Sequence, residues 1–436
     1  MNFYDLAIIN GKIYQDGDFV NSNLYIRDGM IVNVSTDSFE AERTYDAKGN
    51  YVLPGFIDPH VHFNLRVGGG RASSDDFHSG SITAAYGGVT TYIDFLDPVE
   101  DRHQLKEAFE NRMMDAKDSV IDYGFHSTIA NFKDDEEGFI NDIKGLGISS
   151  IKFFTTYSSS NRMTFHNTIR NLLNICKNEN VLLLSHSEDD HLIKEGKFSV
   201  RAHGENRPTI SETVEVLALA EMTRETEGKM YIVHVSSGRT LERVKENYGD
   251  ILNKSFFIES CPQYFYLSKD NYEKENGYLY TMAPPLRSRK EADILEDNID
   301  FVDTIGTDHC PFTSIEKNKE TLDLIPMGIG GIEHSFQLMY TAFGDKVIDK
   351  FTKNPAKLHG LYPKKGSLII GADADIVIFN PNDEYKIEES HSRCDYDLYR
   401  GIKVKGRIIT TISRGRIIMD KGQLLCDEGG EYVKRI

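Results

Sequence analysis

The sequence is short of cysteine, of long apolar runs and of basic charge. Its 436 residues contain only five cysteines, scattered along the chain, so we expect no disulfide framework, as in a protein of the reducing cytoplasm. No window approaches 18 apolar residues, which excludes a membrane span, and the first residues lack the cationic and apolar regions of a signal peptide. The 50 basic side chains are outnumbered by 68 acidic ones, a net charge of −18. This balance argues against a nucleic-acid partner, because a phosphate backbone binds a basic face.

What the chain does contain is an ordinary globular composition, with 39% hydrophobic residues and 35 glycines. This length suits one large barrel or two to three ordinary domains. Both ends have the texture of β-sheet. Near the start, Asn10-Gly11 and Asp28-Gly29 each follow a short apolar segment, as hairpin turns do. Near the end, residues 374–379 and 406–411 are rich in β-forming side chains.

The middle of the chain, roughly residues 54–350, alternates apolar strand candidates with amphipathic stretches of helical length. The strand candidates are Thr90–Phe95, Ser150–Phe154, Val181–Ser185, Met230–Val235 and Phe301–Ile305. The helix candidates are Gln104–Ala116, Thr168–Lys177 and Glu212–Glu227. This alternation predicts βα units around a parallel sheet. If the sheet is a (β/α)₈ barrel, side chains at the carboxyl ends of its strands converge on one face.

Histidines and one aspartate stand where such convergence would bring them together. His60 and His62 are one residue apart in an extended segment, so both point to the same side. His186, His234 and Asp308 each follow a later apolar run. Imidazole and carboxylate are ligands that Zn²⁺ prefers. Any one of these side chains could equally be a solvent-facing or hydrogen-bonded strand end, but their shared position favours a metal site.

Lys152 lies in a strand whose core positions are apolar. A buried ammonium is costly, and burial depresses a lysine pKa. A neutral amine can take up CO₂ to form a carbamate, whose two oxygens can bridge two metals. Residue chemistry alone favours the other interpretation, a lysine paired with a carboxylate at a strand end.

The ordered motifs of the chain closely resemble the amidohydrolase superfamily, and within it the cyclic-amide hydrolases: dihydropyrimidinase (hydantoinase), allantoinase and dihydroorotase. The resemblance spans nearly the whole chain. Its carriers are Pro54-Gly55-Phe56-Ile57-Asp58-Pro59-His60-Val61-His62, Ser74-Asp75-Asp76-Phe77, Gly87-Gly88-Val89-Thr90-Thr91, Ile151-Lys152-Phe153-Phe154, Ser185-His186-Ser187-Glu188, Ile232-Val233-His234-Val235-Ser236, Cys261-Pro262-Gln263-Tyr264, Ala283-Pro284-Pro285-Leu286-Arg287 and Gly306-Thr307-Asp308-His309-Cys310-Pro311-Phe312.

The resemblance implies an α/β architecture, a (β/α)₈ TIM-like barrel over residues 54–359 beside a small β-sandwich built from residues 1–53 and 360–436. It also implies a homo-oligomer, a tetramer or a dimer. Two divalent metal ions are expected, with zinc as the expected metal. His60, His62 and Asp308 would ligate the first ion, His186 and His234 the second, and carbamylated Lys152 would bridge them.

The resemblance further implies hydrolysis of a cyclic amide to an N-carbamoyl amino acid. Two cations sharing a hydroxide provide a nucleophile at neutral pH. Asp308 would take its proton as general base and deliver it to the leaving nitrogen as general acid. Tyr157, five residues after Lys152, matches the family tyrosine that hydrogen-bonds the developing oxyanion.

The substrate is a small cyclic amide whose identity the motifs narrow. Dihydroorotase-like sequences usually carry arginine at the position of Asn64, whereas asparagine occurs in allantoinase-like ones. The Asp75-Asp76-Phe77 stretch and the Ile325–Glu333 loop resemble dihydropyrimidinase instead. Asn64, Ala283 and Met327 are expected substrate contacts, and Ala283 and Met327 both depart from the usual family residues.

Two further possibilities stay open at this point. Arg66 and Arg71 could be surface arginines or could bind an anionic substrate group, which keeps dihydroorotase-type and allantoinase-type activity as alternatives. A non-catalytic scaffold, as in the collapsin response mediator proteins of this superfamily, is disfavoured because all six ligand positions are filled. A cysteine hydrolase built on Cys310 and His309 is disfavoured because adjacent residues rarely present a nucleophile and its base to each other.

Overall fold

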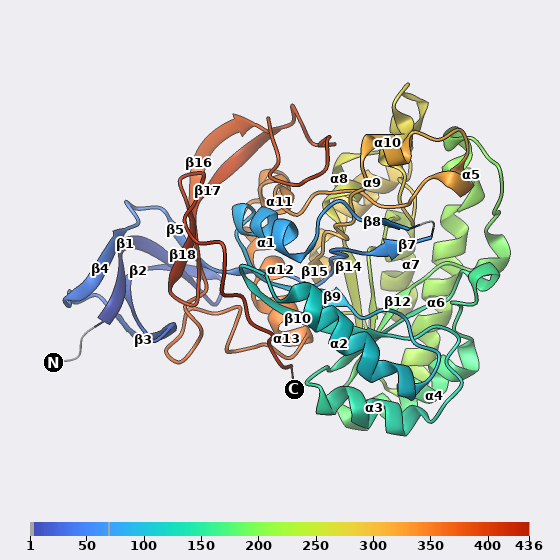
Figure 1. Ribbon diagram of the computed structural model, residues 1–436, viewed down its shortest axis with the longest axis horizontal. Coiled ribbons are helices and arrows are strands. Elements are labelled where there is room, and N and C mark those ends of the chain that lie inside the picture. The colour runs from blue at the N-terminus through green and yellow to red at the C-terminus, as the bar shows by residue number, and fades with distance from the viewer. Residues whose placement is uncertain (1–3, 69, 436) are drawn as a thin grey trace.

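The computed structural model describes residues 4–68 and 70–435, and it contains two parts joined side by side. One part is a β-sheet domain built from both ends of the chain, and the other is a barrel of parallel strands surrounded by helices (Figure 1). Residues 1–3 and residue 436, which the sequence assigns to the first part, lie outside the described residues. The two parts confirm the expected barrel with a small β-sandwich.

The β-sheet domain is one curled, nine-stranded sheet whose order is β19-β18-β17-β16-β5-β1-β2-β3, with β4 paired to β1. Its strands are β1 (Tyr4–Gln15), β2 (Asp18–Arg27), β3 (Met30–Ser35), β4 (Ala41–Asp46), β5 (Tyr51–Pro54), β16 (Ile376–Lys386), β17 (Lys403–Ser413), β18 (Arg416–Asp420) and β19 (Gln423–Leu424). The two chain ends meet where β5 pairs antiparallel with β16, Val52 opposite Ile378. Leu24, Val52 and Ile376 belong to the small apolar core that this sheet encloses.

One of the two expected hairpin turns is wrong. Asp28-Gly29 does connect β2 to β3, with φ of +52° and +74°. Asn10-Gly11 instead lies inside β1, where the register with β2 shifts between Ile8 and Gly11. The strand continues because its second half pairs with β5, and a side chain at Gly11 would meet Val52 at 2.3 Å. The left-handed Asn10 therefore makes a bulge, not a turn.

The barrel contains eight parallel strands in strict sequence order. They are β6 (Phe56–Asp58), β9 (Val89–Phe95), β10 (Asp122–Thr128), β11 (Ser150–Phe154), β12 (Leu182–His186), β13 (Met230–Ile232), β14 (Phe256–Ser260) and β15 (Thr304–Ile305). Just past the first and last strands, the Asp308 amide donates to His60 O (2.9 Å) and the His62 amide to His309 O (3.0 Å). These bonds join the two edges of the sheet on the side where the strands end.

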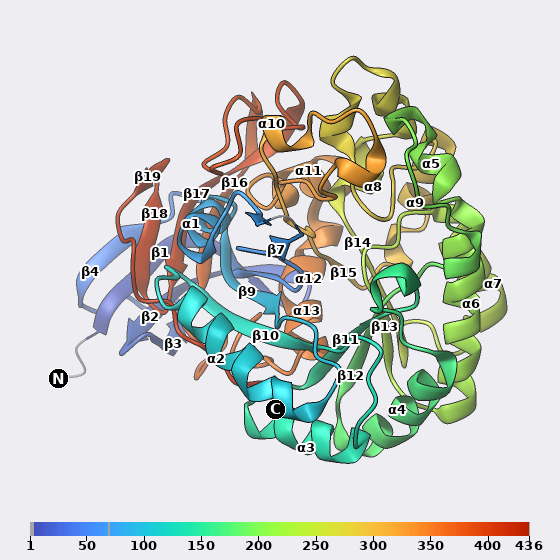
Figure 2. The ribbon, with the colours of Figure 1, turned by 45° about the vertical axis from the view of Figure 1, so that its right-hand side comes forward.

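Helices surround the barrel, as the turned view shows (Figure 2). They are α1 (Phe77–Tyr86), α2 (Leu105–Ala116), α3 (Glu136–Gly145), α4 (His166–Glu179), α5 (His203–Asn206), α6 (Thr209–Thr226), α7 (Gly238–Tyr248), α8 (Pro262–Tyr266), α9 (Arg289–Asp297), α10 (Ser314–Lys317), α11 (Ser335–Phe343), α12 (Ile348–Phe351) and α13 (Lys353–Leu358). A hairpin of β7 (Arg66–Val67) and β8 (Arg71–Ala72) follows β6.

The expected elements of the middle region are present, but two strands are shorter than expected: β13 ends at Ile232, and only Thr304–Ile305 of the strand expected over residues 301–305 is extended in the barrel. The helix expected over residues 168–177 lies within α4, which buries Ile169, Leu172, Leu173 and Cys176. Their spacing of i, i+3, i+4 and i+7 is the apolar stripe of a helix packed on a sheet. None of the helices in the described part of the chain is long and apolar enough to cross a membrane.

Candidate active site

Three predicted ligands meet just beyond the first and last barrel strands. His60 Nε2, His62 Nε2 and Asp308 Oδ1 form a triangle in which each pair of atoms is 3.2 Å apart. Ligand atoms about 2.0–2.2 Å from a tetrahedral zinc ion lie about 3.3–3.6 Å from one another. The triangle therefore has the size and the donor chemistry of a zinc site.

Protonation also suits metal binding at this triangle. Burial lowers the pKa of His62 to about 4, so its imidazole is neutral near pH 7 and offers a lone pair. Burial by itself would raise the pKa of Asp308, but the nearby imidazoles of His60 and His62 outweigh it and hold that pKa well below its usual range. Asp308 is therefore an anion.

A buried glutamate, Glu259 on β14, fixes the ring of His60. His60 Nδ1 lies 2.7 Å from Glu259 Oε1, so the hydrogen-bond network assigns the ring proton to Nδ1 and leaves Nε2 free to ligate. The same carboxylate accepts hydrogen bonds from the Tyr231 hydroxyl (2.7 Å) and the His234 amide (2.9 Å). Sequence analysis missed Glu259, although an acid inside the buried strand Phe256–Ser260 was a usable signal.

The second predicted pair lies beside the first group. His186 Nδ1 and His234 Nε2 are 3.0 Å apart, and the His234 ring centroid is 5.4 Å from that of His60. His186 Nε2 is 2.8 Å from Glu188 Oε2, which assigns its proton to Nε2 and turns the Nδ1 lone pair toward His234. Burial lowers the pKa of His186 to about 4. All four histidines and Asp308 are thus brought to one end of the barrel.

Lys152 is buried on β11, with 3% of its surface exposed. Its Nζ lies 5.4 Å from the ring centroids of Phe95 and Phe154. Within the described residues no carboxylate lies within ion-pair distance of this amine. Burial lowers the pKa of Lys152 to about 8. Its neutral form is therefore accessible near neutral pH, as carbamate formation requires.

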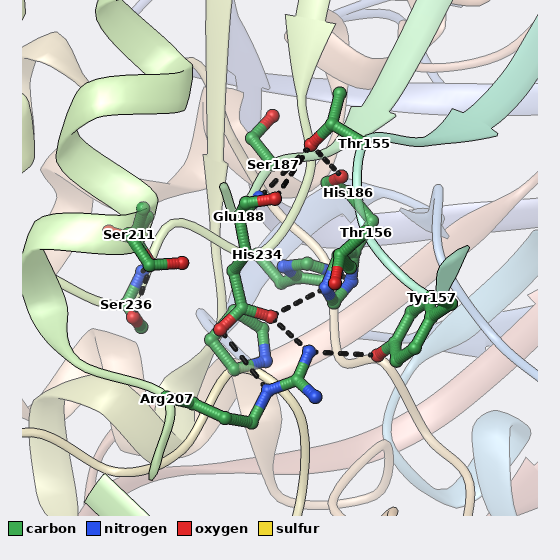
Figure 3. A network of polar contacts seen from close by, with 12 residues as sticks. Thr155, Thr156, Tyr157, His186, Ser187, Glu188, Arg207, Ser211, His234 and Ser236 are labelled. Carbon is green, nitrogen blue, oxygen red and sulfur yellow. Dashed lines mark hydrogen bonds and ion pairs between the residues drawn. The ribbon is translucent and has the colours of Figure 1, made fainter. Parts of the chain in front are cut away.

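Tyr157 lies three residues beyond the end of β11 and is half-buried. Its backbone is left-handed, with φ of +70°. Its hydroxyl accepts a hydrogen bond from Arg207 Nη2 (3.2 Å), and Arg207 is in turn paired with Glu188 (Figure 3). Neither Glu188 nor Arg207 was assigned a role from the sequence, although Glu188 stands in the Ser185–Glu188 motif.

The three expected substrate contacts lie in loops. Asn64 has a φ of +50°, and its amide donates to Asp75 O (2.8 Å). Ala283 and Met327 lie in segments that run together, because the Gly328 amide donates to Thr281 O (3.1 Å).

Lys317 on α10 connects the same two segments. Its buried Nζ donates to Thr281 O (2.7 Å) and to Gly328 O (2.6 Å). The positions of Ala283 and Met327 are therefore coupled.

The two candidate anion-binding arginines already have partners. Arg66 Nη2 bonds both carboxylate oxygens of Asp115 (2.9 and 2.8 Å). Arg71 donates to the carbonyls of Gly68 and Leu324 (3.2 Å each). In this arrangement neither arginine is positioned as a free cation for a substrate carboxylate.

Comparison with known proteins places this chain among well-characterised hydrolases. Residues 51–418 match the model of the amidohydrolase family. D-hydantoinase of Ralstonia pickettii is 32% identical over an alignment 461 positions long, which covers 99% of each chain. D-hydantoinase of Geobacillus stearothermophilus is 34% identical, covering 98% of this chain and 96% of the relative. The crystal structure of dihydropyrimidinase from Brevibacillus agri superposes with a TM-score of 0.90 at 30% identity, covering 98% of each chain.

Proposed function

The chain belongs to the amidohydrolase family, in its hydantoinase group of cyclic amidohydrolases, and we propose that it opens a neutral cyclic ureide to an N-carbamoyl amino acid. The substrate class is a dihydropyrimidine or a 5-substituted hydantoin, since D-hydantoinases and a dihydropyrimidinase are the relatives it resembles. The observation that carries the proposal is the triangle of His60, His62 and Asp308 beside the pair His186 and His234.

This family is metal-dependent, and the group of His60, His62 and Asp308 fits one divalent ion. We propose a second ion at His186 and His234, with zinc as the metal. His60, His62 and Asp308 would hold one ion and His186 and His234 the other, with carbamylated Lys152 shared between them. Bound divalent ions lower the pKa of water and polarise a carbonyl, which is the chemistry that amide hydrolysis needs at neutral pH. Glu259 and Glu188 support this assignment, since each fixes the tautomer of one histidine.

The side chains of the protein perform the proton transfers. Asp308, an anion at the centre of the site, accepts the proton of the water whose oxygen attacks the ring carbonyl. Tyr157 donates its hydroxyl proton in a hydrogen bond to the carbonyl oxygen as negative charge develops there. When the ring C–N bond breaks, Asp308 returns the proton to the leaving nitrogen. The products are a carboxylate and a ureido group on one open chain.

A neutral ring fits better than an anionic one. Arg66 is paired with Asp115, and Arg71 bonds two backbone carbonyls. An anionic substrate such as dihydroorotate would have to break one of these arrangements to use Arg66 or Arg71 as its cation. The ureide of allantoin is neutral, so an allantoinase-type activity stays as the alternative.

The experiment is a substrate panel on purified protein. Dihydrouracil, hydantoin, 5-substituted hydantoins, allantoin and dihydroorotate are compared by kcat/KM before and after metal removal with a chelator. We expect the highest kcat/KM with a dihydropyrimidine or a 5-substituted hydantoin, lost on chelation and restored by zinc. A preference for dihydroorotate, or full turnover without metal, would contradict the proposal.

A further inference from the structure

We propose that Arg207 is a positioning residue for the reaction, which orients the hydroxyl of Tyr157 so that its proton points at the substrate carbonyl. This inference rests on the proposed function, because it gives Tyr157 the oxyanion-binding role. The contacts that carry it run from His186 through Glu188 and Arg207 to Tyr157, and all four side chains are drawn in Figure 3.

The guanidinium of Arg207 is held rigidly by Glu188. Arg207 Nε donates to Glu188 Oε1 (3.2 Å), and Nη2 pairs with Glu188 Oε2. Glu188 is fully buried, and its own amide donates to Thr155 Oγ1 (3.1 Å). Because the carboxylate is fixed and bonds the guanidinium through two nitrogens, the orientation of Arg207 is set before substrate binds.

The contact with Tyr157 has a chemical consequence. Arg207 Nη2 lies 3.2 Å from the Tyr157 hydroxyl oxygen, and a guanidinium can only donate hydrogen bonds. Tyr157 must therefore accept from Arg207, which leaves its single proton available for another acceptor. The positive charge beside the hydroxyl also favours the negative charge that develops on the substrate oxygen. Arg207 thereby prepares Tyr157 as a hydrogen-bond donor.

A second arginine provides a matched comparison. Arg162 stacks over the Tyr157 ring at 4.4 Å, closer than Arg207, whose guanidinium carbon is 5.1 Å from the ring centroid. Arg162 Nε, however, donates its hydrogen bond to Ser160 Oγ (2.9 Å). Both arginines bring charge and packing to the same ring, and the described hydrogen bond to the hydroxyl comes from Arg207.

The test is a double-mutant cycle on whichever cyclic ureide the wild-type protein hydrolyses best. Arg207→Gln, Tyr157→Phe, the double variant and the control Arg162→Gln are compared by kcat, KM and metal content. A charge-assisted hydrogen bond of this kind predicts a loss of about 10- to 100-fold in kcat for Arg207→Gln, with a smaller change in KM. In the Tyr157→Phe background the same substitution is expected to cost less than about threefold, because the hydroxyl on which it acts is gone.

Three results distinguish positioning from a purely structural role. Metal content equal to wild type in Arg207→Gln, a loss below about threefold in Arg162→Gln, and partial recovery of Arg207→Ala by added guanidinium support the assignment. Equal losses from Arg207→Gln in the presence and absence of the Tyr157 hydroxyl would overturn it, as would metal loss that accounts for the drop in kcat. A wild-type protein that opens none of the cyclic amides would overturn the proposed function itself, and this inference with it.

Discussion

Among the described residues, two clusters hold three potential metal-ligand side chains each, with all ligand atoms within 4.8 Å of one another. One is His60, His62 and Asp308 in the barrel. The other is Asp122, Asp373 and Asp375, where β10 meets the β-sheet domain. By ligand count the two clusters are equivalent, and the carboxylate cluster carries more negative charge. The two clusters differ in the lysine that the chain places beside the ligand atoms.

The carboxylate cluster contains its own cation. Lys365 Nζ lies 2.8, 3.1 and 2.7 Å from carboxylate oxygens of Asp122, Asp373 and Asp375. Burial by itself lowers a lysine pKa, but Asp375, Asp122 and Asp373 raise the pKa of Lys365 well above its usual range. The ammonium therefore stays charged, and it fills the position that a metal ion would take.

The barrel cluster has a buried lysine of the opposite kind. Lys152 lies against the rings of Phe95 and Phe154, and burial lowers its pKa to about 8. Part of the Lys152 amine is therefore neutral near neutral pH, so Lys152 keeps its positive charge less firmly than Lys365 does. We therefore expect the barrel cluster, and not the carboxylate cluster, to take up a metal ion.

The largest expected effect comes from replacing Lys152. Lys152→Met should lower kcat/KM by at least about 10³-fold, because the proposed centre loses its bridging carbamate and with it metal. The free energy of unfolding of the metal-free protein should change little or rise, since an unpaired buried amine is removed. Steady-state kinetics measures the loss of kcat/KM, and urea unfolding measures the change in unfolding free energy. Wild-type activity in this variant would contradict the role of Lys152.

The matching substitution in the other cluster should have the reverse outcome. Lys365→Met removes the ammonium shared by three buried carboxylates and leaves only Arg414 beside Asp122 and Lys364 beside Asp373. We expect this to cost about 3–5 kcal/mol of unfolding free energy, while kcat of the folded fraction is retained. Added divalent cations should restore part of this stability, because the carboxylate cluster is then open. The control is Lys353→Met, which breaks a single pair with exposed Asp16 and should cost less than about 1 kcal/mol. If Lys365→Met kept the wild-type unfolding free energy and divalent cations did not change it, the proposed contrast between the two clusters would be wrong.

The two lysines also predict opposite responses to alkaline pH. In metal-free, CO₂-free buffer, Lys152 is neutral in the folded state above pH about 8 but protonated in the unfolded state up to about 10.5. The unfolded state then binds more protons, so stability rises between these values, by about 3 kcal/mol in total. The contribution of Lys365 has the opposite sign, since its raised pKa means that stability is lost only above pH about 10.5. Denaturant melts of wild type, Lys152→Met and Lys365→Met from pH 7 to 11 check both signs.

The smallest effect is expected at an exposed cation near the barrel mouth. Arg66 is half-exposed and paired with Asp115, so Arg66→Gln should change kcat/KM for a neutral ureide by less than about twofold. The same assay with dihydroorotate reveals whether Arg66 leaves Asp115 for an anionic substrate. A loss confined to dihydroorotate would show that an exposed cation, unlike Lys365, remains available to a ligand.

The ligands were predictable from the sequence because the barrel imposes their position. His60, His62, His186, His234 and Asp308 each follow an apolar strand, and parallel strands deliver their carboxyl ends to one face. Lys152 stood out because a lysine in a buried strand is expensive. Element type and order along the chain predicted that the four histidines and Asp308 lie together, whereas the bridging role proposed for Lys152 came only from the family resemblance.

The supporting residues could not be found in this way. Arg207 lies in a loop after α5, and its bonds to Glu188 and Tyr157 depend on the path of that loop. Lys365 is unremarkable in sequence, because one of its three carboxylates, Asp122, lies in the barrel and 243 residues away along the chain. Asn10-Gly11 has the composition of a turn, and only the pairing of β1 with β5 makes it a bulge. Long-range packing decides all three.

The most direct test is the metal content of the purified protein, measured by elemental analysis on wild type and Lys152→Met in parallel. The account predicts close to two divalent ions per chain in wild type, zinc foremost, and a metal-poor Lys152→Met protein that remains folded. An active wild-type protein without bound metal, or a Lys152→Met protein that retains both ions, would contradict the claim that the barrel cluster is the metal centre.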